Sequence, residues 1–301
     1  MTYTNVLFGL TISLPFPCPF LPGAETDSAA DVTLTCAPVP KELPDAVASD
    51  DTWEMGFCWQ AAPGRYLLKG GRRAGRFLVE DGSWVMLHRN PEAEDERLMF
   101  HLLHAVTAAL LRQRGFLVLH ASTVNTPAGA IVLCGKSRAG KSTTLAAMLA
   151  NGCQMVSDDI TVLRLAANGR AEAVPGTALV HLWEDAAQGV GMDAVGSGRH
   201  PLRRGKAALT LRGAPCPDPV PLRRLCMLEP CEGGDVRALR LEGVDKLDAL
   251  MDSVYGPLFP EEHPGLFTLF SSVAAQADIF RIQRPVGLWT VDEIVRAVLD
   301  G

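Results

Sequence analysis

A glycine-rich loop between an apolar run and a helix-like stretch is the feature that most constrains how this chain folds. Residues 131–143 read Ile-Val-Leu-Cys-Gly-Lys-Ser-Arg-Ala-Gly-Lys-Ser-Thr, which fits the phosphate-binding pattern G-x-x-x-x-G-K-[ST]. Gly135 and Gly140 permit backbone turns that a side chain would block, so successive N–H groups can point at one phosphate. The pattern predicts a strand, a loop and a helix in that order, and hence an α/β fold that holds a nucleoside triphosphate.

Each position of this P-loop has an expected part in holding the nucleotide. Lys141 reaches the β- and γ-phosphates, and Ser142 can ligate Mg²⁺. The helix that begins near Lys141 adds the positive end of its dipole to the same site. The predicted nucleotide-binding residues are Gly135, Lys136, Ser137, Arg138, Ala139, Gly140, Lys141, Ser142 and Thr143.

Composition argues against several other classes of protein. The chain has 301 residues, 48% of them hydrophobic, which is enough for one large domain or two modest ones. A net charge of −6 argues against general nucleic-acid binding. No apolar run approaches the ~20 residues that span a bilayer, and four early prolines interrupt any signal-peptide helix. The eight cysteines lack metal-binding spacing, so free thiols and a cytoplasmic location are expected.

The chain is predicted to divide near residue 90. Residues 1–90 hold short apolar segments between prolines and glycines, which indicates a β-rich N-terminal domain. Residues 91–301 are predicted to form the α/β domain that carries the P-loop. Asn90-Pro91 is typical of a helix start, and leucines at helical spacing continue until Gly115. The further elements expected are strands at 116–120, 130–134, 153–156, 160–165 and 225–228, helices at 141–151 and 291–299, and a mobile loop at 189–198.

Two adjacent carboxylates, Asp158 and Asp159, close the strand that follows the P-loop helix. Phosphoryl transfer needs a metal anchor and a group that orients or deprotonates the attacking hydroxyl. Neighbouring strand residues point to opposite faces, so one carboxylate can face the metal and the other the acceptor. A surface turn would explain the pair equally well if it stood alone, and its place after the P-loop helix favours the functional interpretation.

His120 ends the apolar strand that precedes the P-loop strand. A single histidine after such a run is usually structural. Without further information, the structural interpretation of His120 is therefore favoured over a functional one.

These residues together resemble the catalytic domain of bacterial HPr kinase/phosphorylase. The resemblance covers roughly residues 116–165 and lies in His120-Ala121, the P-loop, and the segment from Gly152 to Asp159. The segments Leu-His-Ala-Ser-Thr-Val and Val-Ser-Asp-Asp are more similar still to those of HPr-kinase-related proteins encoded beside ribosomal peptide precursors, including the lasso-peptide kinases. The resemblance implies a P-loop kinase core of the HPr kinase C-terminal type, preceded by a β-rich domain.

The same resemblance implies a role for each matching residue. Lys141 and the loop amides hold the ATP phosphates, and Ser142 ligates Mg²⁺ with Asp158. Asp159 accepts the proton of the substrate hydroxyl, and His120 tunes that carboxylate or touches the phosphate.

The chain also departs from the family pattern. The family's E-[IV]-R-G segment is absent, and Glu184 is the candidate metal ligand in the corresponding stretch. No counterpart of the family's late catalytic arginine is visible, and Arg203, Arg204 and Lys206 are the candidate cations in its place. A solvated basic loop is the alternative interpretation of those three residues.

The sequence therefore predicts an ATP- and Mg²⁺-dependent kinase that phosphorylates a Ser or Thr hydroxyl of a peptide or small protein. A small-molecule hydroxyl kinase and a non-catalytic nucleotide-binding regulatory protein remain open, as does the oligomeric state. A GTPase is disfavoured because the chain has no N-K-x-D motif, and an ABC ATPase because it has no L-S-G-G-Q motif.

Overall fold

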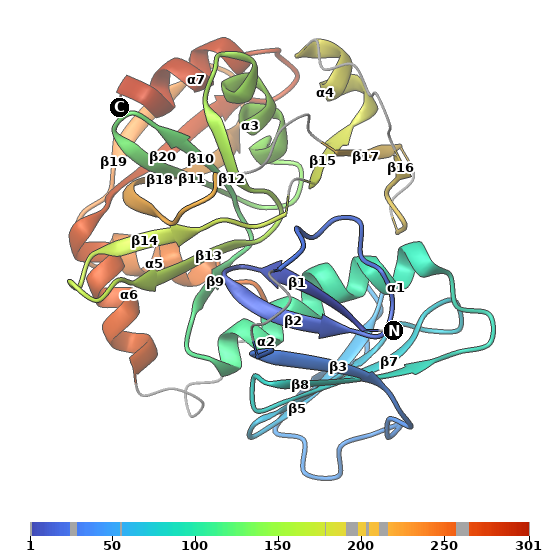
Figure 1. Cartoon of the computed structure of the whole chain (residues 1–301). Coiled ribbons are helices and arrows are strands. Elements are labelled where there is room, and N and C mark those ends of the chain that lie inside the picture. The colour runs from blue at the N-terminus through green and yellow to red at the C-terminus, as the bar shows by residue number, and fades with distance from the viewer. Residues whose placement is uncertain are drawn as a thin grey trace. The chain divides into compact units, whose positions relative to one another are not determined.

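The computed structural model describes residues 2–24, 29–54, 56–177, 179–190, 198–202, 205–210, 216–256 and 265–300 (Figure 1). The chain forms two compact units. The first runs to Phe116 and takes in two short later segments, and the second holds most of the chain from Leu117 onward. The unit boundary matters for function because it decides which side chains share one scaffold with the P-loop.

The first unit is built on one mostly antiparallel sheet. Its strands are β1 (Tyr3–Leu7), β2 (Leu10–Leu14), β3 (Val32–Cys36), β4 (Ala48–Asp50), β5 (Cys58–Ala62), β6 (Arg65–Lys69), β7 (Gly75–Glu80) and β8 (Trp84–Arg89). They lie in the order β1-β2-β3-β8-β7-β6-β5-β4, with β4 to β8 forming an antiparallel meander. The β-rich character predicted for the N-terminal region is present.

A continuous helical segment belongs to this first unit, which corrects the predicted boundary near residue 90. It comprises α1 (Asp95–His101), the π-helical η1 (Leu102–Val106) and α2 (Thr107–Gln113). The Gln113 side chain accepts a hydrogen bond from the Gly82 backbone N–H at 2.8 Å, and Arg114 donates to the Gly82 carbonyl at 2.8 Å. These bonds fasten the helical segment to the turn between β7 and β8, so the unit extends to Phe116.

The start of this helical segment also differs from its prediction at Asn90-Pro91. Glu94, which has an extended backbone, is the N-cap, and helical geometry begins at Asp95. Asn90 instead uses its side-chain amide to donate to the Gly71 carbonyl at 2.9 Å. A side chain engaged across the unit in this way is not available to cap a helix.

The second unit contains the P-loop and two further sheets. Its elements are β9 (Leu117–Leu119), β10 (Ser122–Thr126), β11 (Gly129–Cys134), α3 (Lys141–Ala150), β12 (Gln154–Ser157), β13 (Thr161–Leu165), β14 (Ala171–Val174), β15 (Leu179–Trp183), α4 (Glu184–Gly189), β16 (Gly198–Arg199), β17 (Lys206–Thr210), β18 (Val220–Cys231), β19 (Arg237–Arg240), α5 (Val244–Asp252), α6 (Gly265–Gln276), β20 (Asp278–Pro285) and α7 (Val291–Asp300). The predicted P-loop strand and helix correspond to β11 and α3, and the predicted last helix to α7.

Three neighbouring strands of this unit run parallel. β11 pairs with β18, and β18 pairs with β20. On the other side of β11, β10 pairs antiparallel with both β11 and β12. The carboxyl ends of β11, β18 and β20 therefore meet at one edge of the sheet, and the P-loop leaves from that edge. A separate three-stranded sheet of β15, β17 and β16 completes the unit.

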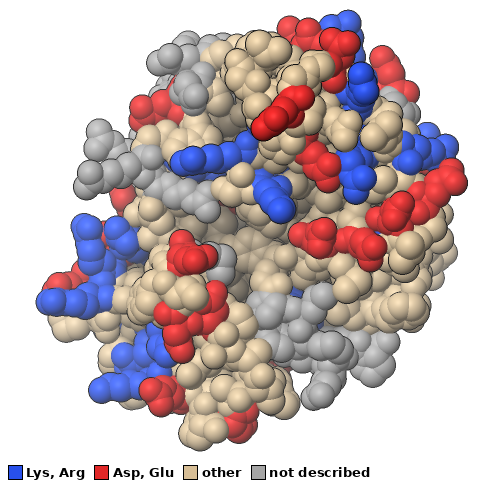
Figure 2. Space-filling model, turned by 180° about the vertical axis from the view of Figure 1, so that it is seen from behind, with Lys and Arg blue, Asp and Glu red and all other residues tan. Residues whose placement is uncertain are grey.

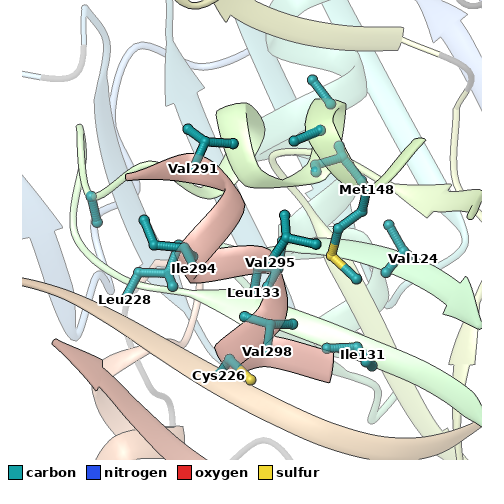
Figure 3. Packing of buried hydrophobic residues seen from close by; sticks show 14 of the residues in the cluster. Val124, Ile131, Leu133, Met148, Cys226, Leu228, Val291, Ile294, Val295 and Val298 are labelled. Carbon is teal, nitrogen blue, oxygen red and sulfur yellow. The ribbon is translucent and has the colours of Figure 1, made fainter. Parts of the chain in front are cut away.

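Helices α3 and α7 pack side by side against one face of this sheet (Figures 1 and 3). Val291, Ile294, Val295 and Val298 recur at helical spacing in α7, and all four are buried. In Figure 3 they face Met148 of α3 and apolar side chains of the parallel strands, such as Leu133. This core holds the P-loop strand and its helix in a fixed relation, because close-packed interiors resist displacement.

Charge is mixed on the surface that the structure describes. On the face drawn in Figure 2, basic and acidic side chains alternate and no continuous basic stretch forms. No helix of the described residues is both long and apolar enough to cross a bilayer. All eight cysteines are free thiols, as predicted.

Candidate functional site

The P-loop has the backbone that its two glycines were expected to permit. Gly135 has a φ of +140° and Gly140 a φ of +104°, and both values lie in the region that side chains disfavour. A Cβ on Gly135 would lie 2.6 Å from the Leu228 carbonyl oxygen, so the loop passes directly against β18. Helix α3 then begins at Lys141 and directs its N-terminal amides toward the loop.

Lys141 is buried beneath the loop rather than extended into solvent. Its ammonium donates to the Gly135 carbonyl at 2.8 Å and to the Lys136 carbonyl at 3.3 Å. Burial lowers the pKa of Lys141, and the nearby charges of Asp159 and Asp158 oppose that shift. The cation thus lies inside the loop, and its hydrogen-bond partners among the residues that the structure describes are neutral carbonyls.

Asp158 lies at the centre of a hydrogen-bonded cluster beside the first turn of α3. Its carboxylate accepts hydrogen bonds from the Ser142 hydroxyl at 3.1 Å, the Ser122 hydroxyl at 2.6 Å and the His181 backbone N–H at 2.9 Å. Burial raises the pKa of Asp158, and the charge of Asp159 raises it further. The two residues predicted to share a metal ion, Ser142 and Asp158, are therefore in direct contact.

Asp159 occupies a strained turn. Its φ is +61°, and the Ile160 N–H bonds the Asp158 carbonyl at 2.7 Å, which is the i to i+2 bond of a γ-turn with a left-handed central residue. Such backbone is uncommon in non-glycine residues and persists where the surroundings hold it. The hydroxyl oxygens of Ser157 and Thr161, on either side of the turn, lie 3.1 Å apart and are hydrogen-bonded to each other. The turn directs the two adjacent carboxylates to different partners.

The Asp159 carboxylate contacts two residues of the separate small sheet. One oxygen lies 2.6 Å from His181 Nδ1, and the other lies 3.6 Å from Lys206 Nζ. In the pairing of β15 with β17, Lys206 lies opposite Trp183, which is two positions from His181. The side chains of His181 and Lys206 therefore lie on the same face of the small sheet. Lys206 was among the cations predicted for this site, and it is buried here.

His181 is a site residue that sequence reasoning did not single out. The other buried residues of β15 are Leu179, Val180 and Leu182, a pattern that indicates a core strand. A histidine within such a strand was a detectable signal, since a buried imidazole needs a hydrogen-bond partner. The His200 ring lies 4.8 Å from the His181 ring and is also buried.

His120 contacts the backbone of Asp159, whereas the resemblance had suggested its carboxylate or the phosphate. Nδ1 lies 3.0 Å from the Asp159 carbonyl oxygen, so this nitrogen is the donor and carries the proton. Burial, with a smaller contribution from the Lys141 charge, lowers the pKa of His120 to about 4. His120 is therefore neutral near pH 7 and holds the γ-turn in place through its carbonyl.

Several other candidate residues do not join this cluster. Glu184 is exposed at the start of α4, and no hydrogen bond or ion pair within the described ranges links its carboxylate to Ser142 or Asp158. Arg203, Arg204 and most of the predicted loop at 189–198 lie outside the described residues.

One arginine that sequence reasoning missed braces the P-loop. Arg284 at the end of β20 donates to the Ala139 carbonyl at 2.7 Å and the Arg138 carbonyl at 3.0 Å. Arg138 itself has a φ of +67° and places its guanidinium 5.2 Å from the centre of the Trp183 ring. The loop is thus held by β20 as well as by its own glycines.

Comparison with known proteins leaves the family open. No protein-family model matches the chain, and no curated protein matches it. Among solved structures it is similar to the HPr(Ser) kinase/phosphatase from Coxiella burnetii at 14% identity and a TM-score of 0.28, over 61% of this chain and 93% of that one. A TM-score this low does not establish a common fold, so any functional argument depends on the site itself.

Proposed function

We propose that this protein is an ATP-dependent phosphotransferase. The observation that carries the proposal is the hydrogen bond between Ser142 of the P-loop and Asp158, at 3.1 Å. It joins a phosphate-binding loop to a buried carboxylate pair, which is the combination that phosphoryl transfer requires. Pure nucleotide sensing would need the loop but not the second carboxylate in a strained turn.

The donor set at Ser142 and Asp158 fits Mg²⁺. Hydroxyl and carboxylate oxygens are the ligands that this ion prefers. Asp158 is buried beside a second carboxylate and its pKa is raised, so a divalent cation would relieve the repulsion between them. When bound, the ion would neutralise charge on the β- and γ-phosphates.

The residues of the chain then take distinct roles in the transfer. Lys141 leaves the loop carbonyls and pairs with the β- and γ-phosphates. Asp159 accepts the proton of the acceptor hydroxyl, whose oxygen forms a bond to the γ-phosphorus as the bond to the bridging oxygen of ADP breaks. Lys206, beside Asp159, offsets negative charge on the transferring group. His181 orients the Asp159 carboxylate through its short Nδ1 contact.

A Ser or Thr hydroxyl of a peptide or small protein is the acceptor we propose. The support for it is the sequence resemblance to peptide-cassette kinases around His120, the P-loop and Asp158-Asp159. The site itself requires only a hydroxyl that can approach Asp159. The distinction between a peptide and a metabolite is therefore left to experiment.

The test measures phosphoryl transfer from γ-labelled ATP to Ser- and Thr-containing peptides, free sugars and nucleosides. Lys141→Ala should lower transfer by about 10²-fold or more, because a charge-stabilising donor is lost. Lys41→Ala, which removes an exposed lysine of the first unit, is the matched control and should leave the rate unchanged. Equal rates in the two variants would contradict the P-loop assignment.

Mass spectrometry identifies the acceptor in the same reactions. A gain of about 80 daltons, the mass of one phosphoryl group, is expected on peptides. The same gain on small molecules alone would replace the peptide acceptor with a metabolite.

A further inference from the structure

The three parallel strands of the second unit end at one edge, and each is followed by a loop there. The P-loop follows β11, residues 232–236 follow β18, and residues 286–290 follow β20. Ligands of open α/β sheets bind in the crevice beyond the carboxyl ends of such strands. A nucleotide held by its phosphates in the P-loop therefore has the other two loops within its reach.

Hydrogen bonds fix the loop after β20 directly beside the P-loop. Arg284 donates to the carbonyls of Ala139 and Arg138, at 2.7 and 3.0 Å. Two residues later, the Val286 N–H bonds the Cys231 carbonyl at the end of β18, at 3.0 Å. The loop thus leaves β20 from a point that is hydrogen-bonded to the P-loop.

A hollow of about 290 Å³ lies between these loops and the first turns of α7. Its size approaches the lower end of the range for ligand pockets, about 300–1,000 Å³, so it suits one ring system rather than a whole nucleotide. Both apolar and polar side chains line it. The residues that matter here are Val236, Pro285, Leu288, Asp235, Glu293 and Thr290.

The loop also exposes apolar side chains to an unusual degree. Val286, Leu288 and Trp289 are 51%, 61% and 56% exposed, in a stretch of four residues. The indole of Trp289 lies against Gly189 at the end of α4, where an added Cβ would come within 2.3 Å of the ring. Exposed apolar side chains that gather in one loop are typical of a surface that binds a ligand or a partner.

We propose that the hollow and the apolar side chains of the β20–α7 loop form the nucleobase subsite, which rests on the function proposed above. The flat face of the base would contact Leu288 and Trp289, since aromatic and apolar side chains suit heterocycles. The carboxylates of Asp235 and Glu293 would accept hydrogen bonds from an exocyclic amino group such as that of adenine. The Thr290 hydroxyl, buried without a recorded partner among the described residues, adds one further polar group.

The experiment separates the base from the phosphates by using two probes, Mg-ATP and inorganic triphosphate with Mg²⁺. Calorimetry gives the Kd of each probe for the full-length protein and for the double variant Leu288→Ala/Trp289→Ala. ATP affinity should fall about 5- to 100-fold in the variant, whereas triphosphate affinity should stay within about twofold. Leu299→Ala removes an exposed leucine at the far end of α7 and should change neither affinity.

Each result has one meaning. If wild-type protein binds both probes and the double variant binds ATP as tightly as wild type, the base subsite is wrong and the proposed function stands. If wild-type protein binds neither probe, the proposed function itself fails. A double variant that has lost triphosphate binding as well has a damaged P-loop. The variant Gly189→Ala, whose added Cβ meets the Trp289 ring, then decides. In that variant an unchanged ATP Kd contradicts the subsite, and a raised ATP Kd with an unchanged triphosphate Kd supports it.

Discussion

At the scale of single residues, the γ-turn at Asp159 separates two adjacent carboxylates into different environments. Asp158 accepts hydrogen bonds from two serine hydroxyls and a backbone N–H, whereas Asp159 meets an imidazole and an ammonium group. An extended strand would also have turned the two side chains apart, but it would not have required strain. The strain indicates that the position of the Asp159 carboxylate is held by its surroundings.

Neutralising the two carboxylates should therefore affect the enzyme kinetics in different ways. Asp159→Asn keeps the shape and tolerates a positive φ, so it should lower kcat about 10²- to 10⁴-fold with little change in nucleotide Kd. Asp158→Asn should raise the Mg²⁺ concentration needed for half-maximal rate. Steady-state kinetics with a Mg²⁺ titration measure both effects. Asp252→Asn, an exposed carboxylate in α5, is the control, and near-full turnover of Asp159→Asn would place the base elsewhere.

At the scale of elements, β20 acts on the P-loop through one side chain. Arg284 donates two hydrogen bonds to loop carbonyls, and hydrogen bonds from charged donors are worth more than neutral ones. The loop carries positive φ values at Gly135, Arg138 and Gly140, so its shape depends on such external support.

Loss of this brace should weaken nucleotide binding without removing any phosphate ligand. Arg284→Met should raise the Kd of Mg-ATP about tenfold and that of inorganic triphosphate by a similar factor, because the whole loop loosens. Arg281→Met is the matched control on the same strand, since it removes only a partly exposed ion pair with Glu229. Equal Kd values for both variants would show that the glycines alone shape the loop.

At the scale of the whole molecule, the two units should respond to different conditions. The first unit buries His101 among the rings of Phe57, Phe77 and Phe100, and neither ring nitrogen has a hydrogen-bond partner among the described residues. Burial lowers the pKa of His101 to about 4, and the charge of His104 contributes. The folded unit thus binds the proton less readily than the unfolded chain does.

Acid should destabilise the first unit through this histidine. The contribution of the neutral His101 to the free energy of unfolding is fully present above the ordinary pKa of about 6.5. It is lost as the pH falls toward 4, because the unfolded state takes up the proton first. The loss should reach about 2–3 kcal/mol at pH 4.5. Urea unfolding at pH 7 and pH 4.5 measures it, and His101→Leu should show a smaller loss between the two values. An equal loss of unfolding free energy in the wild type and in His101→Leu would show that His101 is not the cause.

Nucleotide should act on the second unit. A ligand at 100 times its Kd stabilises the state that binds it by about 2.7 kcal/mol. Hydrogen exchange with and without Mg-ATP should therefore show slower exchange in α3, β11 and β18, and unchanged exchange in the meander of β5 to β8. Equal protection in both units would instead indicate that they unfold together.

The sequence by itself determined the parts of the protein whose geometry depends on near neighbours. The P-loop follows from glycines a few residues apart, α3 from its place between that loop and Gly152, and α7 from apolar residues at helical spacing. Such elements are fixed by local backbone conformation and by the period of burial, and both can be read in a short window.

Only the tertiary structure decided which distant residues complete the site. His181 and Lys206 reach Asp159 because β15 pairs with β17 in one register, and Arg284 reaches the P-loop because β20 lies next but one to β11. The extent of the first unit likewise depends on bonds from Gln113 and Arg114 to Gly82. These contacts join residues more than twenty positions apart, and the strand pairing and packing that create them are properties of the folded chain as a whole.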